Sequence, residues 1–212
     1  MRPSKHLAKL HDKMSRRLNK LRRLVNYAST VPFPDANRIM SYVTLECHSM
    51  FANFARSYFL SCTISTRRET GPEITCIPTI VTFNDAISAC MRRCKHKVWL
   101  SGNWTRRDEP PWHQPKTLID SCHEINCSNY TDIIAAFSVP TRVFNDLTKF
   151  RNYFAHRNEY TFGFTKVVAN HYSIPTHHHP SKILCTQAYG RPQVLMLDWI
   201  DDIEVIIEFL CR

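Results

Sequence analysis

The chain has 212 residues, enough for one domain with a sizeable core, and its hydrophobic fraction of 43% is near that of ordinary globular proteins. It carries 28 lysines and arginines against 18 acidic residues, a formal net charge of +10. This balance favours a polyanionic partner such as a nucleic acid, an acidic protein or an anionic membrane surface. The composition argues against a disordered chain, and no apolar run reaches the roughly 18 residues of a membrane span.

Nine cysteines are many for this length, and their number is odd. The charged N-terminus has no apolar segment of the kind found in secretory signals, so we expect buried free thiols in a reducing cytoplasm. Two groups of residues come closest to a metal site: Cys90, Cys94 and His96; and Cys122, His123 and Cys127. Neither group has a familiar zinc-binding spacing, so we expect no metal and no cofactor. No function is assigned to the run His177–His179.

Residues 4–28 are predicted to form a helix within a basic N-terminal segment, residues 1–30. An apolar stripe runs along it at helical spacing: Leu7, Leu10, Met14, Leu18, Leu21 and Val25. Basic residues, Arg16 and Arg17 among them, surround the stripe. They indicate either a solvated face on a packed helix or a wall that faces RNA. A membrane-surface helix is a third interpretation, against which the lack of Trp and Phe on the apolar side argues.

Four further helices are predicted before residue 140. Their ranges are 35–62, with Asp35 as the N-cap residue after two prolines; 82–97, capped by Asn84; 115–125; and 129–138. Residues 63–78 are predicted to be a connector. Three polar residues interrupt the long helix, and each is expected either to be exposed to solvent or to face a later helix across the bundle and orient His156: Glu46, Asn53 and Arg56.

The loop of residues 101–115 contains two tryptophans, Trp104 and Trp112, with Arg106 and Arg107 between them. Such a group can stack on and hold single-stranded RNA. The more common role of a loop tryptophan is to fix the loop to the protein's own core.

Residues 140–158 are predicted to form the helix that carries the chemistry. One apolar stripe at spacings of four, three and four indicates its core face: Val143, Leu147, Phe150 and Phe154. A second stripe is rotated from the first by about 200°, at ~100° per residue: Asn145, Lys149, Asn152 and His156. The imidazole of His156 should therefore point away from the core, with Arg151 beside it.

After this helix the residues become β-branched and apolar, in the segments FTKVVAN (164–170) and ILCTQAYGRPQVLMLDW (183–199). The turn signal Tyr189–Pro192 lies inside the second segment. We therefore predict a loop and small β-hairpin insertion over residues 165–197, followed by a last helix over residues 199–211.

The second stripe offers what cleavage of RNA without a metal requires. Imidazole suits proton transfer because its pKa lies near neutral pH, so His156 is the predicted general base or acid. The planar guanidinium of Arg151 can grip a phosphate and stay charged, and Asn152 would orient His156 or the scissile phosphate. Four cations are assigned to RNA binding: Lys149, Arg157, Arg16 and Arg17.

The segment LTKFRNYFAHRNEY (147–160), with its Arg-Asn-x3-His motif, resembles the signature of HEPN domains, small all-α proteins of toxin–antitoxin, phage-defence and RNA-processing systems. More loosely, the segment at 44–62 is similar to the long early helix of this fold, and those at 109–120 and 129–137 are similar to the segment that precedes the motif helix in the RiboL-PSP-like prokaryotic branch. The resemblance implies a mainly α, up-and-down HEPN-like bundle. We expect one such domain over residues 1–212, with the hairpin inserted before the last helix.

The resemblance also implies a metal-independent endoribonuclease that works by 2′-OH transesterification at a composite site. A homodimer is expected, because one chain supplies one such histidine on a stripe that faces away from its own core. RNA and an antitoxin or defence-system protein are the expected partners. The alternative is a non-catalytic HEPN-like module that binds nucleic acid or nucleotides and dimerises within a larger assembly. A metal nuclease lacks the clustered carboxylates it would need.

Overall fold

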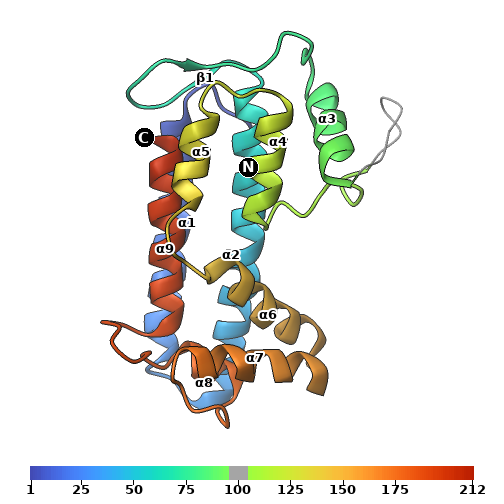
Figure 1. Cartoon of the computed structure of the whole chain (residues 1–212). Coiled ribbons are helices and arrows are strands. Elements are labelled where there is room, and N and C mark those ends of the chain that lie inside the picture. Colours follow the sequence, from blue (N-terminus) through green and yellow to red (C-terminus); the bar gives the residue numbers. More distant parts are fainter. Residues whose placement is uncertain (96–104) are drawn as a thin grey trace. The chain divides into compact units, whose positions relative to one another are not determined.

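The computed structural model describes residues 1–95 and 105–212 as a mainly helical chain with one small antiparallel hairpin (Figure 1). This confirms the predicted mainly α class with a small β-hairpin. Residues 96–104, which include His96 and Trp104 of the sequence analysis, lie outside the described residues. The elements, in chain order, are α1 (Leu7–Ala28), α2 (Phe33–Cys62), β1 (Thr66–Arg67), β2 (Glu73–Ile74), α3 (Phe83–Lys95), α4 (Pro115–Glu124), α5 (Tyr130–Phe137), α6 (Val143–His156), α7 (Glu159–His171), α8 (Pro180–Leu184) and α9 (Leu195–Cys211).

The described chain divides into two compact units, and three long helices contribute to both. Unit 1 comprises residues 1–14, 51–140 and 206–212, and unit 2 comprises residues 15–50 and 141–205. Unit 1 therefore contains the hairpin with α3, α4 and α5, while unit 2 contains α6, α7 and α8.

Unit 1 is built on the second half of α2, whose buried side chains recur at helical spacing: Phe51, Phe54, Tyr58, Phe59 and Cys62. In this unit α3 packs against α4, and α4 packs against α5. Trp112 is buried against Phe59, with ring centroids 5.3 Å apart, and its indole N–H donates a hydrogen bond to Glu109 at 2.8 Å. Trp112 therefore fixes its loop to the core.

Unit 2 buries the apolar stripe of α6, together with the later part of the α1 stripe and the earlier part of the α9 stripe. In α6 the buried residues include the four predicted ones, which confirms the predicted core face: Val143, Leu147, Phe150 and Phe154. Phe150 meets Trp199 of α9 edge-on, with ring centroids 5.6 Å apart. Helix α6 also packs against α7, and α7 packs against α8. These contacts fix how α6 is rotated, and hence which of its residues face outward.

The hairpin lies elsewhere than the sequence analysis predicted. β1 and β2 pair within the expected connector, Thr66 opposite Ile74, and Gly71 of the turn between them has a φ of +120°, which glycine adopts without strain. Before α9 the structure has one antiparallel bridge, between Gln187 and Val194. The segment 164–170 belongs to α7 instead. Its helical start is explained by Asn158, whose side chain accepts a hydrogen bond from the Thr161 N–H at 2.9 Å.

Two predicted caps also differ. Asp35 lies in the first turn of α2, which begins two residues earlier, and is not its N-cap. At α3 the capping pair is Thr82 and Asp85: the Thr82 N–H donates to Asp85 at 2.8 Å, and the Asp85 N–H donates to the Thr82 hydroxyl at 3.2 Å. This reciprocal pair, and not the predicted Asn84, caps the helix.

None of the helices in the described ranges has both the length and the apolarity that crossing a bilayer would require. All nine cysteines lie in those ranges and are free thiols, six of them buried; Cys76, Cys94 and Cys185 are half-buried.

Candidate functional site

Helix α6 carries the Arg-Asn-x3-His motif on the side that its buried stripe leaves open. Arg151 and Asn152 are half-buried, and His156, in the last turn, is exposed. Nη1 of Arg151 donates a hydrogen bond to Oδ1 of Asn152 at 3.1 Å. The carboxamide is thus held by the guanidinium of the preceding residue, and the imidazole is open to solvent.

The end of α6 places a cation next to the histidine. Arg157 caps the helix with left-handed backbone angles, φ 47° and ψ 44°, and its N–H donates to the Tyr153 carbonyl at 2.6 Å. Glycine is the usual residue in this conformation, because a side chain there costs on the order of 1–2 kcal/mol. The side chain of Arg157 is exposed, so a strained position presents a positive charge at the motif.

A buried carboxylate that the sequence does not single out lies in the first turn of α6. Asp146 is fully buried in α6, where Lys149 donates to it at 3.1 Å. Arg142 and the Tyr172 hydroxyl lie 3.4 Å from its other oxygen. The charge of Lys149 is therefore compensated inside the protein. The signal for such a residue was its spacing, because Asp146 precedes Leu147 within the apolar stripe.

Tyr153, between the motif residues, is held by a histidine from the His177–His179 run. Its Oη lies 3.1 Å from Nε2 of His179, the residue that caps α8. Burial raises the pKa of Tyr153 above its ordinary value, although the charge of Arg157 acts in the opposite direction. Burial, together with the charge of Arg157, lowers the pKa of His179. Both groups are thereby kept neutral near pH 7.

The two predicted RNA-binding arginines of α1 differ in their surroundings. Arg16 is exposed, whereas Arg17 is half-buried and forms an ion pair with Glu46 of α2. Glu46, one of the three residues that could have oriented His156, is therefore paired with Arg17 instead. The other two residues offered for that role bind residues of unit 1: Asn53 accepts from Arg106, and Arg56 donates to Glu109 at 2.6 and 2.8 Å. None of the three is simply exposed to solvent.

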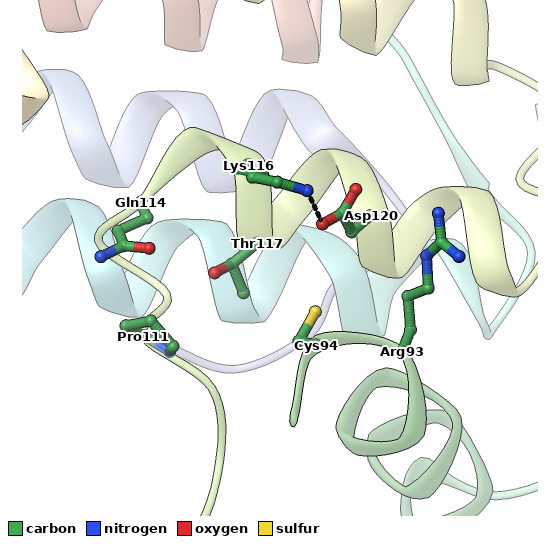
Figure 2. Close-up of a pocket in the computed structure, with 7 residues that line it drawn as sticks. All are labelled: Arg93, Cys94, Pro111, Gln114, Lys116, Thr117 and Asp120. Atoms are coloured by element: carbon green, nitrogen blue, oxygen red, sulfur yellow. Dashed lines mark hydrogen bonds and ion pairs between the residues drawn. The ribbon is translucent and has the colours of Figure 1, made fainter. Parts of the chain in front are cut away.

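Unit 1 contains a pocket of about 390 Å³ between the end of α3 and α4, and none of the predicted site residues lines it. Figure 2 shows the thiol of Cys94 directed toward α4, where Lys116 pairs with Asp120. The hydroxyl of Ser121, also on α4, lies 2.7 Å from the sulfur of Cys90 and 3.8 Å from that of Cys94. Hydrogen bonds from Cys90 and Ser121 lower the pKa of the Cys94 thiol to about 7, although burial acts against them.

The remaining thiols and the histidines offer less chemistry. Burial is the main cause that raises the pKa of the Cys122 thiol, and the neighbouring Cys62 and Cys127 thiols raise it further. Among the described residues, no group of three or more His, Cys, Asp or Glu side chains has an arrangement that could hold a metal ion. His123 stacks edge-on against Tyr130, with ring centroids 5.1 Å apart.

Comparison with known proteins adds no relative to this description. No protein-family model, no curated protein and no solved structure matches the chain.

Proposed function

We propose that this protein is a metal-independent endoribonuclease of the HEPN kind, with Arg151, Asn152 and His156 as its catalytic residues. The observation that carries the proposal is the division of α6 into two faces. The helix buries its apolar stripe and leaves the imidazole of His156 exposed, with two cations, Arg151 and Arg157, within a few residues of it. An exposed histidine flanked by arginines is suited to a phosphodiester substrate.

RNA supplies its own nucleophile in such a reaction. His156 takes the proton of a 2′-hydroxyl, or gives a proton to the leaving 5′-oxygen, while the 2′-oxygen attacks the adjacent phosphorus. Arg151 stabilises the negative charge that builds up on the phosphorane oxygens. The P–O5′ bond breaks, which leaves a 2′,3′-cyclic phosphate on one product and a 5′-hydroxyl on the other. Asn152 keeps Arg151 in place through their hydrogen bond.

Two proton transfers need two acid–base groups, and the motif supplies one histidine per chain. A two-fold dimer that pairs the outward stripes of two α6 helices would bring two histidines and two arginines into one cleft. Asn145 and His156, at the two ends of this stripe, are both exposed and free to meet a second copy.

Binding of the RNA strand falls to the cations around the motif and on α1. Arg157 is exposed, so its charge can reach a phosphate directly, and Arg16 of α1 is exposed to solvent as well. Lys149 and Arg17 contribute less, because each is paired with a carboxylate, Asp146 and Glu46 respectively. A cytoplasmic toxin or phage-defence effector, neutralised or activated by a partner protein, is the biological setting that this activity fits.

The decisive experiment is incubation of the purified protein with single-stranded RNA in excess EDTA. We expect cleavage, with 2′,3′-cyclic phosphate ends, and no cleavage of DNA of the same sequence, because DNA lacks the nucleophile. A strict requirement for Mg²⁺, or cleavage of the deoxy substrate, would contradict the mechanism. Tight RNA binding without any cleavage would favour a non-catalytic HEPN-like binding module instead.

A further inference from the structure

The hydrogen bonds around His179 determine which of its ring nitrogens carries the hydrogen. Nδ1 accepts the backbone N–H of Ser181 at 3.2 Å and lies 2.8 Å from the Ser181 hydroxyl. A backbone N–H can only donate, so Nδ1 must offer its lone pair. In the neutral imidazole the hydrogen is then on Nε2. His179 therefore donates, through Nε2, to the phenol oxygen of Tyr153, 3.1 Å away.

This direction leaves the phenolic hydrogen of Tyr153 unused by His179. The Tyr153 hydroxyl accepts a hydrogen bond from the imidazole and can donate its own hydrogen to an acceptor outside the protein, on a bound ligand. Tyr153 lies two residues after Arg151 and three before His156 on α6, so this donor belongs to the same helix end as the motif. A strong acceptor there, such as a phosphate oxygen, would complete the chain of hydrogen bonds from Ser181 outward.

The surroundings of this hydroxyl suit one nucleotide of an RNA strand. The positive charge of Arg157 is close enough to influence both Tyr153 and His179. The ring of Phe33 meets His179 edge-on, with centroids 5.1 Å apart, and is 52% exposed. A cation with a hydroxyl donor recognises a phosphate, and an exposed aromatic ring accepts a stacked base.

We infer that Tyr153 and Arg157 form a phosphate-binding subsite for the RNA strand beside the catalytic motif, with His179 as the positioning residue that orients the Tyr153 hydroxyl. This inference rests on the proposed ribonuclease function and names the residues that hold the strand next to the scissile bond. A merely structural role for the Tyr153–His179 hydrogen bond, tying α8 to α6, predicts no effect on RNA.

The test uses a single-stranded 2′-O-methyl oligoribonucleotide, which cannot be cleaved because its nucleophile is blocked. Tyr153→Phe should weaken its binding about tenfold, the effect of one hydrogen bond to a charged acceptor. Arg157→Asn, chosen because asparagine tolerates the left-handed backbone, should weaken binding and also reduce the log–log salt slope by about 0.7. Tyr153→Phe removes no charge and should leave the slope unchanged.

His179→Asn tests the positioning role, because asparagine still caps a helix but cannot reach Tyr153. It should reproduce the Tyr153→Phe loss, and combining the two substitutions should add little to either. The control is Tyr160→Phe, which removes an equivalent hydroxyl from an exposed tyrosine of α7 and should change nothing. With cleavable RNA, Tyr153→Phe should raise KM more than it lowers kcat.

The outcomes separate this inference from the proposed function. If the parent cleaves RNA but Tyr153→Phe binds the blocked strand as well as the parent does, the subsite is wrong and the ribonuclease stands. A ¹⁵N NMR spectrum that places the hydrogen of neutral His179 on Nδ1 would also overturn the inference. If the parent neither binds nor cuts RNA, both fall together.

Discussion

The carboxylate of Asp146, fully buried in α6, accepts a hydrogen bond from the ammonium group of Lys149 at 3.1 Å, one turn further along the same helix. A lysine on the outward stripe is thereby tied to the interior of unit 2. The same carboxylate also pairs with Arg142 and accepts a hydrogen bond from the Tyr172 hydroxyl. Burial of Asp146 therefore stabilises the helix that carries the motif.

Asp146→Asn should destabilise the protein by about 2 kcal/mol, since it removes the charge that holds these donors and turns an amide N–H toward them. Urea unfolding followed by circular dichroism measures the change. The matched control is Asp35→Asn, because Asp35 forms an exposed i,i+3 pair with Arg38 at 3.3 Å. Its loss should cost less than about 1 kcal/mol. Equal effects of both substitutions would show that burial of Asp146 contributes nothing.

His156→Ala and Arg151→Ala should each lower RNA cleavage by about 10² to 10⁴, the usual value of an acid–base group or phosphate clamp, with little change in thermal stability. Steady-state cleavage and a melting curve give the two quantities. His171→Ala, on an exposed histidine at the end of α7, is the control and should cleave like the parent. Cleavage at the parental rate by either motif variant would remove that residue from the mechanism.

Light scattering at micromolar concentration should give a mass near twice the 24.8 kDa of the chain. Asn145→Arg places a bulky charge on the outward stripe without changing a motif residue, and should shift the mass toward that of a monomer and reduce cleavage with it. The control is Ile134→Arg, which adds the same charge at a 44% exposed position of α5, outside this stripe. A monomer that cleaves RNA efficiently at every concentration would refute the composite site.

The role of the basic helix α1 is tested by three exposed cations: Lys13, Lys20 and Arg23. Replacing each by Gln should reduce the log–log salt slope of RNA binding by about 0.7 per lost phosphate contact on single strands. Arg17 and Arg22 are unsuitable, because they pair with carboxylates of unit 2 and their loss would also affect folding. The double variant Arg92→Gln, Arg93→Gln on α3 is the control. An unchanged slope in the α1 variants would assign this helix to packing.

Cys94 should be the first thiol that iodoacetamide alkylates in the native protein. With its pKa lowered to about 7, about half of this thiol is ionised at pH 7, whereas burial raises the pKa of the half-buried Cys185 to about 11. Hydrogen bonds also lower the pKa of Cys127, but this residue is 4% exposed and closed to the reagent.

The rate of the fast phase should rise with pH, reach half of its maximum near pH 7 and level off at higher pH, because only the thiolate reacts. Cys94→Ser should abolish that phase, and mass spectrometry identifies the labelled peptide. Labelling of Cys185 before Cys94 would show that the environment of Cys94 does not activate it.

The elements that sequence alone could predict are those whose signal is local. The spacing of Val143, Leu147, Phe150 and Phe154 identifies a helix face without any knowledge of its neighbours, and the structure buries all four. Helix α7 was missed because Thr165, Val167 and Val168 favour strands as single residues. Packing against α6 and the cap at Asn158 override that preference.

In the site, too, only relationships between residues close together in the sequence could be predicted. Arg151 and His156 are five residues apart, so the period of one helix relates them. His179 is 26 residues from Tyr153, and only the folded chain brings the two within a hydrogen bond. Asp146 lies at the spacing of the apolar stripe, but charged residues are rarely buried, and its partner Tyr172, 26 residues away, is not recognisable from the local sequence.

On the proposed function, the left-handed backbone of Arg157 sets stability against RNA binding at a single position. Glycine would occupy these angles without strain, so Arg157→Gly should gain stability on the order of 1 kcal/mol while it removes a cation beside His156. A library selected only for heat resistance would therefore enrich glycine here, and the variants it returned would hold RNA less well. Thermal selection of this protein needs a parallel screen for nucleic-acid binding, or it will discard the arginine first.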